Sequence, residues 1–385
     1  MVLHGYTFDE TQWKSLGGNG QCVTATKGGK PYFIKRLNKP KYPESSNFSG
    51  DFKKAKIAEC ETWLKRRKAI AAALPGAGSG NIIKPVEYFR EGPCFYEITN
   101  LVDITSIPYT EIWKVAKQDK ARMMMTIAMS LAEIHKAGIV HGDLDPGNIL
   151  ISKSAAGHLI TKIIDFTDAF LAADPPEAIM SKDAWWSPEV ALYSKAHDQH
   201  PNPYREYISC KADVFSLGLI FHQYCTKGGN FPKHKGDYPW QGFAGGGSLT
   251  IDPTIEPEFQ ALISSMLEVE PSNRPSMEDI HKTLRKIALG ETTSKQPPEP
   301  PKKSIQPFQP ATPAKTPVTP PRAPSISRNG ITPGPNRTRS GASVTSANLN
   351  ERNPKKVELV FSDGKKQIMD LALALAQGLV KQNKN

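Results

Sequence analysis

The sequence lacks the features that mark exported, membrane-spanning or zinc-bound proteins. Its five cysteines are scattered and never spaced as Cys-x-x-Cys, so neither a disulfide framework nor a cysteine zinc site is indicated. The opening stretch MVLHGYTFDETQW has no apolar run typical of a signal peptide. The longest apolar stretch near the C-terminus, IMDLALALAQGLV, is too short and too polar to span a bilayer. We therefore expect a soluble, cytoplasmic protein without a membrane partner.

Acidic residues are missing from one long stretch, between Glu299 and Glu351. Residues 291–385 hold 15 Lys and Arg against 6 Asp and Glu, which gives +9 of the chain's net charge of +11. The basicity therefore belongs to the tail. Residues 1–290 carry no excess charge that would indicate a specific nucleic-acid partner.

The same tail is rich in proline, with 13 of the chain's 33 prolines between Pro297 and Pro335. Such a segment buries too little apolar surface to offset its ordering entropy, so residues 291–350 are predicted to be a disordered linker. Its PxxP patterns fit a plain spacer or a ligand for SH3-like domains, and its charge could attract an acidic partner. Residues 351–385 are predicted to form a strand, KVELVF, and a helix, QIMDLALALAQGLVKQ, that dock on the main domain, a second copy or a partner.

Residues 1–290 divide into a β-rich front and a helical back. Strand-like runs are QCVTAT, PYFIKRL, NIIKPVEYF and CFYEITNLV, with a Lys-rich helix predicted between residues 51 and 73. From about Ala121 the pattern becomes mainly helical. We therefore predict an α+β domain of two lobes, with a β-rich lobe at residues 1–102, a helical lobe at residues 103–290 and a cleft between them.

Polar side chains stand where two strand-like runs end. HGDLDPGNIL carries Asp143 and Asn148, and IIDFTDAF carries Asp165. Carboxylate and amide oxygens are ligands for Mg²⁺, which keeps phosphate oxygens and waters in the rest of its shell. The pattern therefore indicates phosphate chemistry, with Asn148 and Asp165 holding the metal and Asp143 free to orient or deprotonate a hydroxyl.

These motifs resemble the catalytic loop and the metal-binding DFG of protein kinases, and the resemblance extends over residues 8–288. It implies ATP and Mg²⁺ as cofactors, with Asp143 as the catalytic base and Lys35 in YFIKRL as the lysine that holds the phosphates. Its expected helix partner is Glu59, preferred to Glu61 because Trp63 would then pack behind it on the same helix face.

The resemblance also implies a nucleotide site and three bracing residues. In SLGGNGQCV the glycines Gly17, Gly18 and Gly20 have an irregular spacing for a phosphate-covering loop. Further expected nucleotide contacts are Val23, the gatekeeper Thr99, and Asn100 to Val102 at the adenine-binding hinge. Glu189 of SPE and Arg274 are expected to form a buried ion pair, and Asp213 to brace the catalytic loop.

Four positions depart from the family pattern. Thr167 replaces the last glycine of DFG, which predicts a less mobile segment. Gly142 replaces the arginine that commonly reads a phosphate in the activation segment, so activity is not expected to require that phosphate. Asp145 and Lys182 exchange the usual polarity beside the acceptor site and are predicted to pair.

The interpretation that we favour is a protein kinase of bacterial or phage type that acts on Ser or Thr rather than Tyr. Two alternatives share part of the pattern. One is a small-molecule phosphotransferase similar to aminoglycoside and choline kinases, although these generally lack the SPE and distal arginine elements. The other is a nucleotide-binding pseudokinase scaffold that uses the PxxP tail. HDQH at residues 197–200 is a weak metal-binding candidate.

Overall fold

The computed structural model describes residues 1–16, 20–44, 50–74, 80–102, 106–179, 181–199 and 201–291, together with strands at 331–333, 344–350, 353–361, 366–370 and 380–382. The chain forms two compact units, Met1–Phe308 and Gln309–Asn385. Among the described residues, no helix is both long and apolar enough to cross a membrane.

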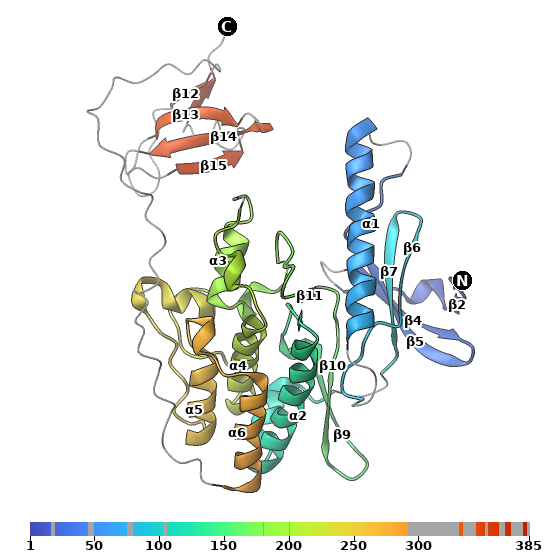
Figure 1. Ribbon diagram of the computed structural model, residues 1–385, viewed down its shortest axis with the longest axis vertical. Coiled ribbons are helices and arrows are strands. Elements are labelled where there is room, and N and C mark those ends of the chain that lie inside the picture. The colour runs from blue at the N-terminus through green and yellow to red at the C-terminus, as the bar shows by residue number, and fades with distance from the viewer. Residues whose placement is uncertain are drawn as a thin grey trace. The chain divides into compact units, whose positions relative to one another are not determined.

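The first unit begins with a seven-stranded antiparallel sheet in the order β1-β2-β4-β5-β7-β6, with β3 paired to β4 (Figure 1). Its strands are β1 (Val2–Leu3), β2 (Tyr6–Thr7), β3 (Lys14–Ser15), β4 (Gly20–Lys27), β5 (Lys30–Leu37), β6 (Glu87–Glu91) and β7 (Cys94–Asn100). The predicted strands are therefore confirmed, although NIIKPVEYF becomes a strand only at Glu87.

The two faces of this sheet bury different residues because side chains alternate along a strand. On one face Ile34 packs with Leu3, Tyr6 and Phe8 of the N-terminal segment. On the other face Leu37 packs against helix α1 (Gly50–Ala73). Lys35 lies on this second face, two residues before Leu37, and so points away from the N-terminal segment.

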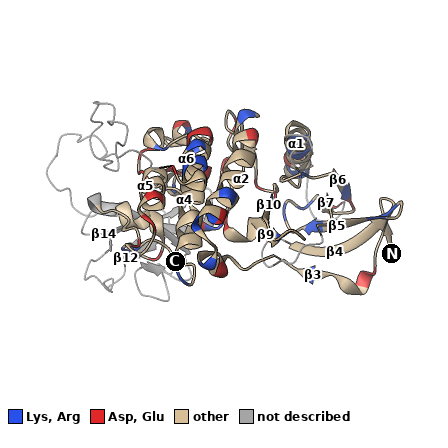
Figure 2. Cartoon of the chain, turned by 90° about the horizontal axis from the view of Figure 1, so that it is seen from below, with Lys and Arg blue, Asp and Glu red and all other residues tan. Residues whose placement is uncertain are grey.

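The rest of the first unit is mainly helical, as predicted. It contains α2 (Lys117–Lys136), α3 (Pro188–Lys195), α4 (Lys211–Cys225), α5 (Pro257–Met266) and α6 (Met277–Leu289). Helix α4 is buried from Ala212 to Cys225, which makes it the centre of the lobe. Figure 2 shows Lys and Arg interspersed with Asp and Glu on the outer helices. The predicted bilobal α+β fold is confirmed.

Two short antiparallel ribbons stand at the edge of the helical lobe. Strand β8 (Ile139–Val140) pairs with β11 (Phe170–Leu171), and β9 (Ile149–Lys153) pairs with β10 (Leu159–Ile163). The loops that join these ribbons contain the HGDLDPGN and DFT motifs. The backbone N–H of Ile164 donates to the carbonyl of Asn148 at 3.0 Å, so the two motifs lie beside each other.

The second unit corrects part of the sequence-based prediction. KVELVF lies in β14 (Asn353–Phe361), which pairs with β13 (Val344–Asn350) and β15 (Lys366–Asp370). The predicted helix is wrong at its start, because residues 366–370 instead satisfy their backbone hydrogen bonds along β14. Residues 371–379 lie outside the described part. Strands β12 (Ile331–Pro333) and β13 place regular structure inside the predicted linker, whose residues 292–330 and 334–343 are outside the described part. Strand β16 (Val380–Gln382), which pairs with β12, lies at the end of the predicted helix, so that prediction is wrong there too.

Candidate active site

Asp143 accepts hydrogen bonds from the catalytic loop itself and from the segment before α3. The Asn148 side chain donates from Nδ2 to the Asp143 carbonyl at 2.7 Å and to its Oδ2 at 3.2 Å, and the Lys182 backbone N–H donates to Oδ1 at 3.2 Å. Burial raises the pKa of Asp143 to about 6, and Asp168 and Asp145 act in the same direction, whereas the Lys182 hydrogen bond opposes them. A carboxylate with this pKa accepts a proton more readily than an ordinary aspartate.

Asp213, at the start of α4, fixes the backbone of the same loop. It accepts from the backbone N–H groups of His141 at 2.8 Å and Gly142 at 3.1 Å, and it contacts His135 Nε2 at 2.9 Å. Burial alone would raise the Asp213 pKa, but the hydrogen bond and charge of His135 outweigh it and lower that pKa. The predicted bracing contact is confirmed.

Lys35 is joined to the DFT motif. Its Nζ lies 3.0 and 2.8 Å from the two carboxylate oxygens of Asp165 and 3.0 Å from Thr167 Oγ1. Asp165 has a φ of 63°, a left-handed conformation that is uncommon outside glycine and clusters at functional sites. The Thr167 hydroxyl, which glycine would lack, is therefore part of the Lys35 cluster.

The predicted pairing of Lys35 with Glu59 is wrong. Glu59 lies on the outer face of α1, where it is 59% exposed and pairs with Lys56 at 2.6 Å. The face of α1 that reaches the DFT motif presents Arg67, which donates from Nη1 to the carbonyls of Phe166, at 3.4 Å, and Thr167. Helix α1 therefore presents an arginine to the DFT motif, where a glutamate that pairs with Lys35 was expected.

A buried acid that the sequence-based assignment missed lies across the sheet from Lys35. Glu97 on β7 is paired in register with Lys35 on β5 and is 3% exposed. Burial and the charge of Asp165 raise its pKa, while Lys35, Tyr88 and Thr167 lower it in part. A charged residue in the otherwise apolar run CFYEIT was the signal that could have identified it.

The structure places only some of the expected nucleotide contacts on the Lys35 face of the sheet. Gly20 has a φ of 130°, and a Cβ there would lie 2.0 Å from the Arg36 carbonyl oxygen, so only glycine fits. Val23 is wrongly assigned, because it is buried with the N-terminal segment on the opposite face; Cys22 is the residue paired with Lys35. Thr99 pairs in register with Phe33, on the Lys35 face.

The remaining hinge and loop residues are placed only in part. Asn100 ends β7 and is exposed, and Val102 follows it half-buried. Gly17 and Gly18 lie outside the described residues. The register of the phosphate-covering loop therefore stays a prediction.

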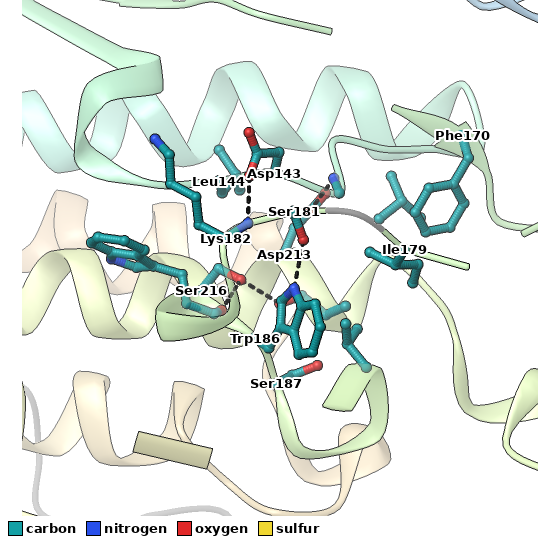
Figure 3. A pocket seen from close by; sticks show the side chains of 15 residues that line it. Asp143, Leu144, Phe170, Ile179, Ser181, Lys182, Trp186, Ser187, Asp213 and Ser216 are labelled. Atoms are coloured by element: carbon teal, nitrogen blue, oxygen red, sulfur yellow. Dashed lines mark hydrogen bonds between the residues drawn. The ribbon is translucent and has the colours of Figure 1, made fainter. Parts of the chain in front are cut away.

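The space beside Gly142 is a small cavity of about 20 Å³ between the catalytic loop and the segment before α3 (Figure 3). Gly142 has a φ of 77°, and a Cβ would lie 3.0 Å from the Asp168 carbonyl oxygen and from the Phe170 ring. A longer side chain at this position would therefore require both neighbours to move.

Lys182 and Asp145 form the predicted ion pair, since Lys182 Nζ donates to Asp145 Oδ2. The other carboxylate oxygen of Asp145 accepts from the backbone N–H of Gly147 at 2.6 Å. Asp145 is buried, whereas the Lys182 side chain is 53% exposed. The pair therefore links the loop to the segment that precedes α3.

Glu189 and Arg274 form the predicted buried ion pair. The two guanidinium nitrogens donate to the two carboxylate oxygens at 2.6 and 2.8 Å, and both side chains are at most 3% exposed. Arg274 also donates to three backbone carbonyls, of Glu268, Lys211 and Val269. Every part of its guanidinium is therefore hydrogen-bonded.

The donor set near Asp165 suits a divalent cation. Asn148 turns its amide nitrogen toward Asp143 and Asp145, which leaves its oxygen available as a ligand. Burial and the negative charge of Asp165 raise the pKa of Asp168, while Lys35 and Arg67 lower it in part. Of the described residues, no three His, Cys, Asp or Glu form a metal cluster. The HDQH candidate has no support in His197, whose Nδ1 contacts the Ser194 carbonyl at 3.0 Å, and His200 is outside the described part.

The chain is similar to known proteins over most of its first unit. The family model described as protein kinase domain matches residues 16–284. A calcium and calcium/calmodulin-dependent serine/threonine-protein kinase of Lotus japonicus is 29% identical over 171 residues, which cover 43% of this chain and 31% of that protein. Serine/threonine-protein kinase STK11 of Gallus gallus is 30% identical over 181 residues, 45% of this chain and 38% of that protein.

A probable serine/threonine-protein kinase of Dictyostelium discoideum is similar over a longer stretch. It is 24% identical over 248 residues, which cover 62% of this chain and 54% of that protein. The chain thus spans about a third to a half of the length of these curated relatives.

Proposed function

Because the chain belongs to the protein kinase family, we propose that it transfers the γ-phosphoryl group of ATP to serine or threonine hydroxyls of a protein substrate. The observation that carries this proposal is the cluster in which Lys35 of the sheet meets Asp165, beside Asn148 and Asp143 of the catalytic loop. The names of the relatives favour Ser and Thr as acceptors. No described feature favours a small-molecule acceptor.

The roles follow from the charges at the site. Lys35 is the buried cation that would hold phosphate oxygens, and Asp165 with the Asn148 amide oxygen would hold Mg²⁺, which neutralises charge on the transferred group when bound. Asp143 would orient the acceptor hydroxyl and take its proton, helped by its raised pKa. Positioning and electrostatics would supply most of the rate enhancement.

We also propose that activity does not require phosphorylation of the segment before α3. Gly142 has no cation that would read such a phosphate, and Asp174 in this segment already pairs with Arg66 of α1 at 2.8 Å and with Arg205 at 3.3 Å. An aspartate there supplies a permanent negative charge. The segment is therefore tied to α1 without modification.

Two further proposals, on the partners of the basic tail and on localisation, rest on composition. The basic, proline-rich stretch would act as a spacer or bind an SH3-like or acidic partner. Five free cysteines favour a reducing, cytoplasmic setting.

The test is phosphate transfer from labelled ATP to generic protein substrates, with Mg²⁺ and with EDTA, beside Asp143→Asn. The wild type is expected to label protein only with Mg²⁺, and the variant to be at least about 100-fold slower because it has no base. Nucleotide binding without protein labelling would indicate a small-molecule acceptor. Absence of nucleotide binding would leave a scaffold role.

A further inference from the structure

We propose that Glu97 of β7 is the carboxylate that positions Lys35, a task for which the resemblance implied a glutamate on the helix. The proposal rests on the proposed function, because positioning Lys35 matters only if Lys35 holds a phosphate. It makes Glu97 a positioning residue that acts through Lys35 and has no contact with the reacting atoms.

The register of the sheet places the two side chains together. Lys35 on β5 is the cross-strand partner of Glu97 on β7, and partners in an antiparallel pair point to the same face with their Cβ atoms about 5 Å apart. Both side chains are buried, with exposures of 4% and 3%. The Lys35 ammonium forms its direct ion pair with Asp165, and the Glu97 carboxylate adds a further attraction to the same ammonium.

Thr167 connects the two charged groups. Its Oγ1 lies 3.0 Å from Lys35 Nζ, 2.9 Å from Glu97 Oε2 and 2.7 Å from Asp165 Oδ1. The ammonium has only donors, so the hydroxyl accepts from Lys35 and donates its one hydrogen to a carboxylate. Thr167 thus extends the contact of Lys35 from Asp165 to Glu97.

Tyr88 fixes Glu97 from the adjacent strand. Tyr88 on β6 pairs in register with Glu97, and its hydroxyl donates to Glu97 Oε2 at 2.5 Å. Tyr88 is itself 3% exposed. Three strands of one sheet therefore set the position of this carboxylate and leave it little freedom to turn away.

Helix α1 contributes to the same region with the opposite charge. Arg67 is 8% exposed and binds the carbonyls of Phe166 and Thr167, while Glu59 faces solvent. The helix thus holds the DFT backbone, and the carboxylate for Lys35 comes from the sheet. When the Asp165 carboxylate shares its charge with a bound metal, Glu97 would still supply a negative charge beside Lys35.

The experiment compares Glu97→Gln with Glu59→Gln, the same change on the outer face of α1. Glutamine keeps the size of the side chain but removes its charge. We expect the dissociation constant of a fluorescent ATP analogue and the KM for ATP to rise about tenfold in Glu97→Gln, as for loss of one charge-assisted contact. The KM for the protein substrate should stay within about twofold, and Glu59→Gln should match the wild type in all three quantities.

The proposal is overturned if Glu97→Gln binds nucleotide like the wild type, or if Glu59→Gln is the weaker binder. Failure of the proposed function is distinct, since the wild type would then label no protein while its nucleotide affinity still depended on Glu97. Thermal melting checks folding. If Glu97→Gln does not fold, Thr167→Val, which removes the bridging hydroxyl, is compared with Thr167→Ser, which keeps it. Only the valine variant should lose affinity for nucleotide, and equal affinities would contradict the proposal.

Discussion

Two buried ion pairs in the first unit have opposite electrostatic surroundings. In the helical lobe, Arg274 meets Glu189 with two hydrogen bonds and satisfies its other donors with backbone carbonyls. At the cleft, Lys35 faces Asp165, and the further acids Glu97 and Asp168 act on the same ammonium. The first pair is balanced, whereas at the second three acids face two cations, Lys35 and Arg67.

This difference indicates that the Glu189–Arg274 pair stabilises the fold, whereas the Lys35–Asp165 pair belongs to a ligand-binding site. A balanced buried pair loses stability when either partner is removed, because the other charge is left unpaired. Burial first, and the charge of Asp165 second, raise the pKa values of Glu97 and Asp168, and a bound cation would favour their charged forms. Variants of each pair should therefore change different observables.

The largest expected effect is on activity, in Asp165→Asn. Loss of the carboxylate should lower the rate of phosphate transfer by about 1000-fold, equivalent to about 4 kcal/mol of transition-state stabilisation. The free energy of unfolding should also fall, because Lys35 outweighs burial and lowers the pKa of Asp165, but it should fall by less than in Arg274→Ala, since Glu97 stays beside Lys35. Kinetics and urea denaturation measure the two quantities. Asp119→Asn, on the outside of α2, is the matched control, and an unfolded Asp165→Asn protein would argue against the contrast.

The balanced pair should show the reverse in Arg274→Ala. Glu189 would be left as a buried, unpaired charge, so the free energy of unfolding should fall by about 3–5 kcal/mol. Urea denaturation checks this value against Arg122→Ala, which removes an exposed arginine paired with Asp119 at 2.6 Å and should cost less than about 1 kcal/mol. If Arg274→Ala also lowers the free energy of unfolding by less than about 1 kcal/mol, the Glu189–Arg274 pair does not stabilise the fold.

The sequence predicted well the parts of the site that lie on one short segment or in a fixed order. Asp143 and Asn148 are five residues apart, so the loop itself brings them together, and the pairs Asp145 with Lys182 and Glu189 with Arg274 followed from the order of the family's motifs. The lobes and most strands followed from alternating and helical patterns.

The partner of Lys35 could not be predicted in this way. Which face of α1 meets the sheet depends on packing by Cys60 and Leu64, and in this orientation Glu59 is exposed although Trp63, four residues later, packs on the same cluster. The strand register that sets Glu97 beside Lys35 and turns Val23 to the other face is likewise a property of the assembled sheet. The helix prediction failed at residues 366–370 for a related reason, because pairing with β14 overrides the helical pattern of the sequence.

A smaller effect is expected where an ion pair is only half-buried, as in Lys182→Met. Its charge is 53% exposed, so the pair should contribute at most about 1 kcal/mol, or about fivefold in kcat/KM for the protein substrate. The KM for ATP should be unchanged, because Lys182 contacts Asp143, which is proposed to orient the acceptor hydroxyl. Steady-state kinetics with Lys282→Met, an exposed lysine on α6, as control tests this. Equal losses for both substrates would place Lys182 elsewhere in the mechanism.

The last prediction concerns pH, and it extends the contrast to a neutral group in the helical lobe. His222 is 1% exposed; its Nδ1–H donates to the Asn230 carbonyl at 2.9 Å, and its Nε2 accepts from the Asp252 N–H at 3.1 Å. Burial lowers its pKa below 6.5, against opposing effects of Asn230 and Asp252. Below pH 6.5, His222 therefore binds a proton in the unfolded chain but stays neutral in the folded chain, and the free energy of unfolding falls as the pH drops.

The slope from His222 can reach at most about 1.4 kcal/mol per pH unit for one proton. Urea denaturation at pH 7.5 and pH 5.5 should show this loss in the wild type, and His222→Gln, which keeps a donor and an acceptor, should lose less stability between the same two values. The comparison between proteins removes the contribution of all other groups that titrate in both. If the two proteins respond equally to acid, His222 is protonated in the folded state and the helical lobe tolerates a buried charge that its hydrogen bonds do not match.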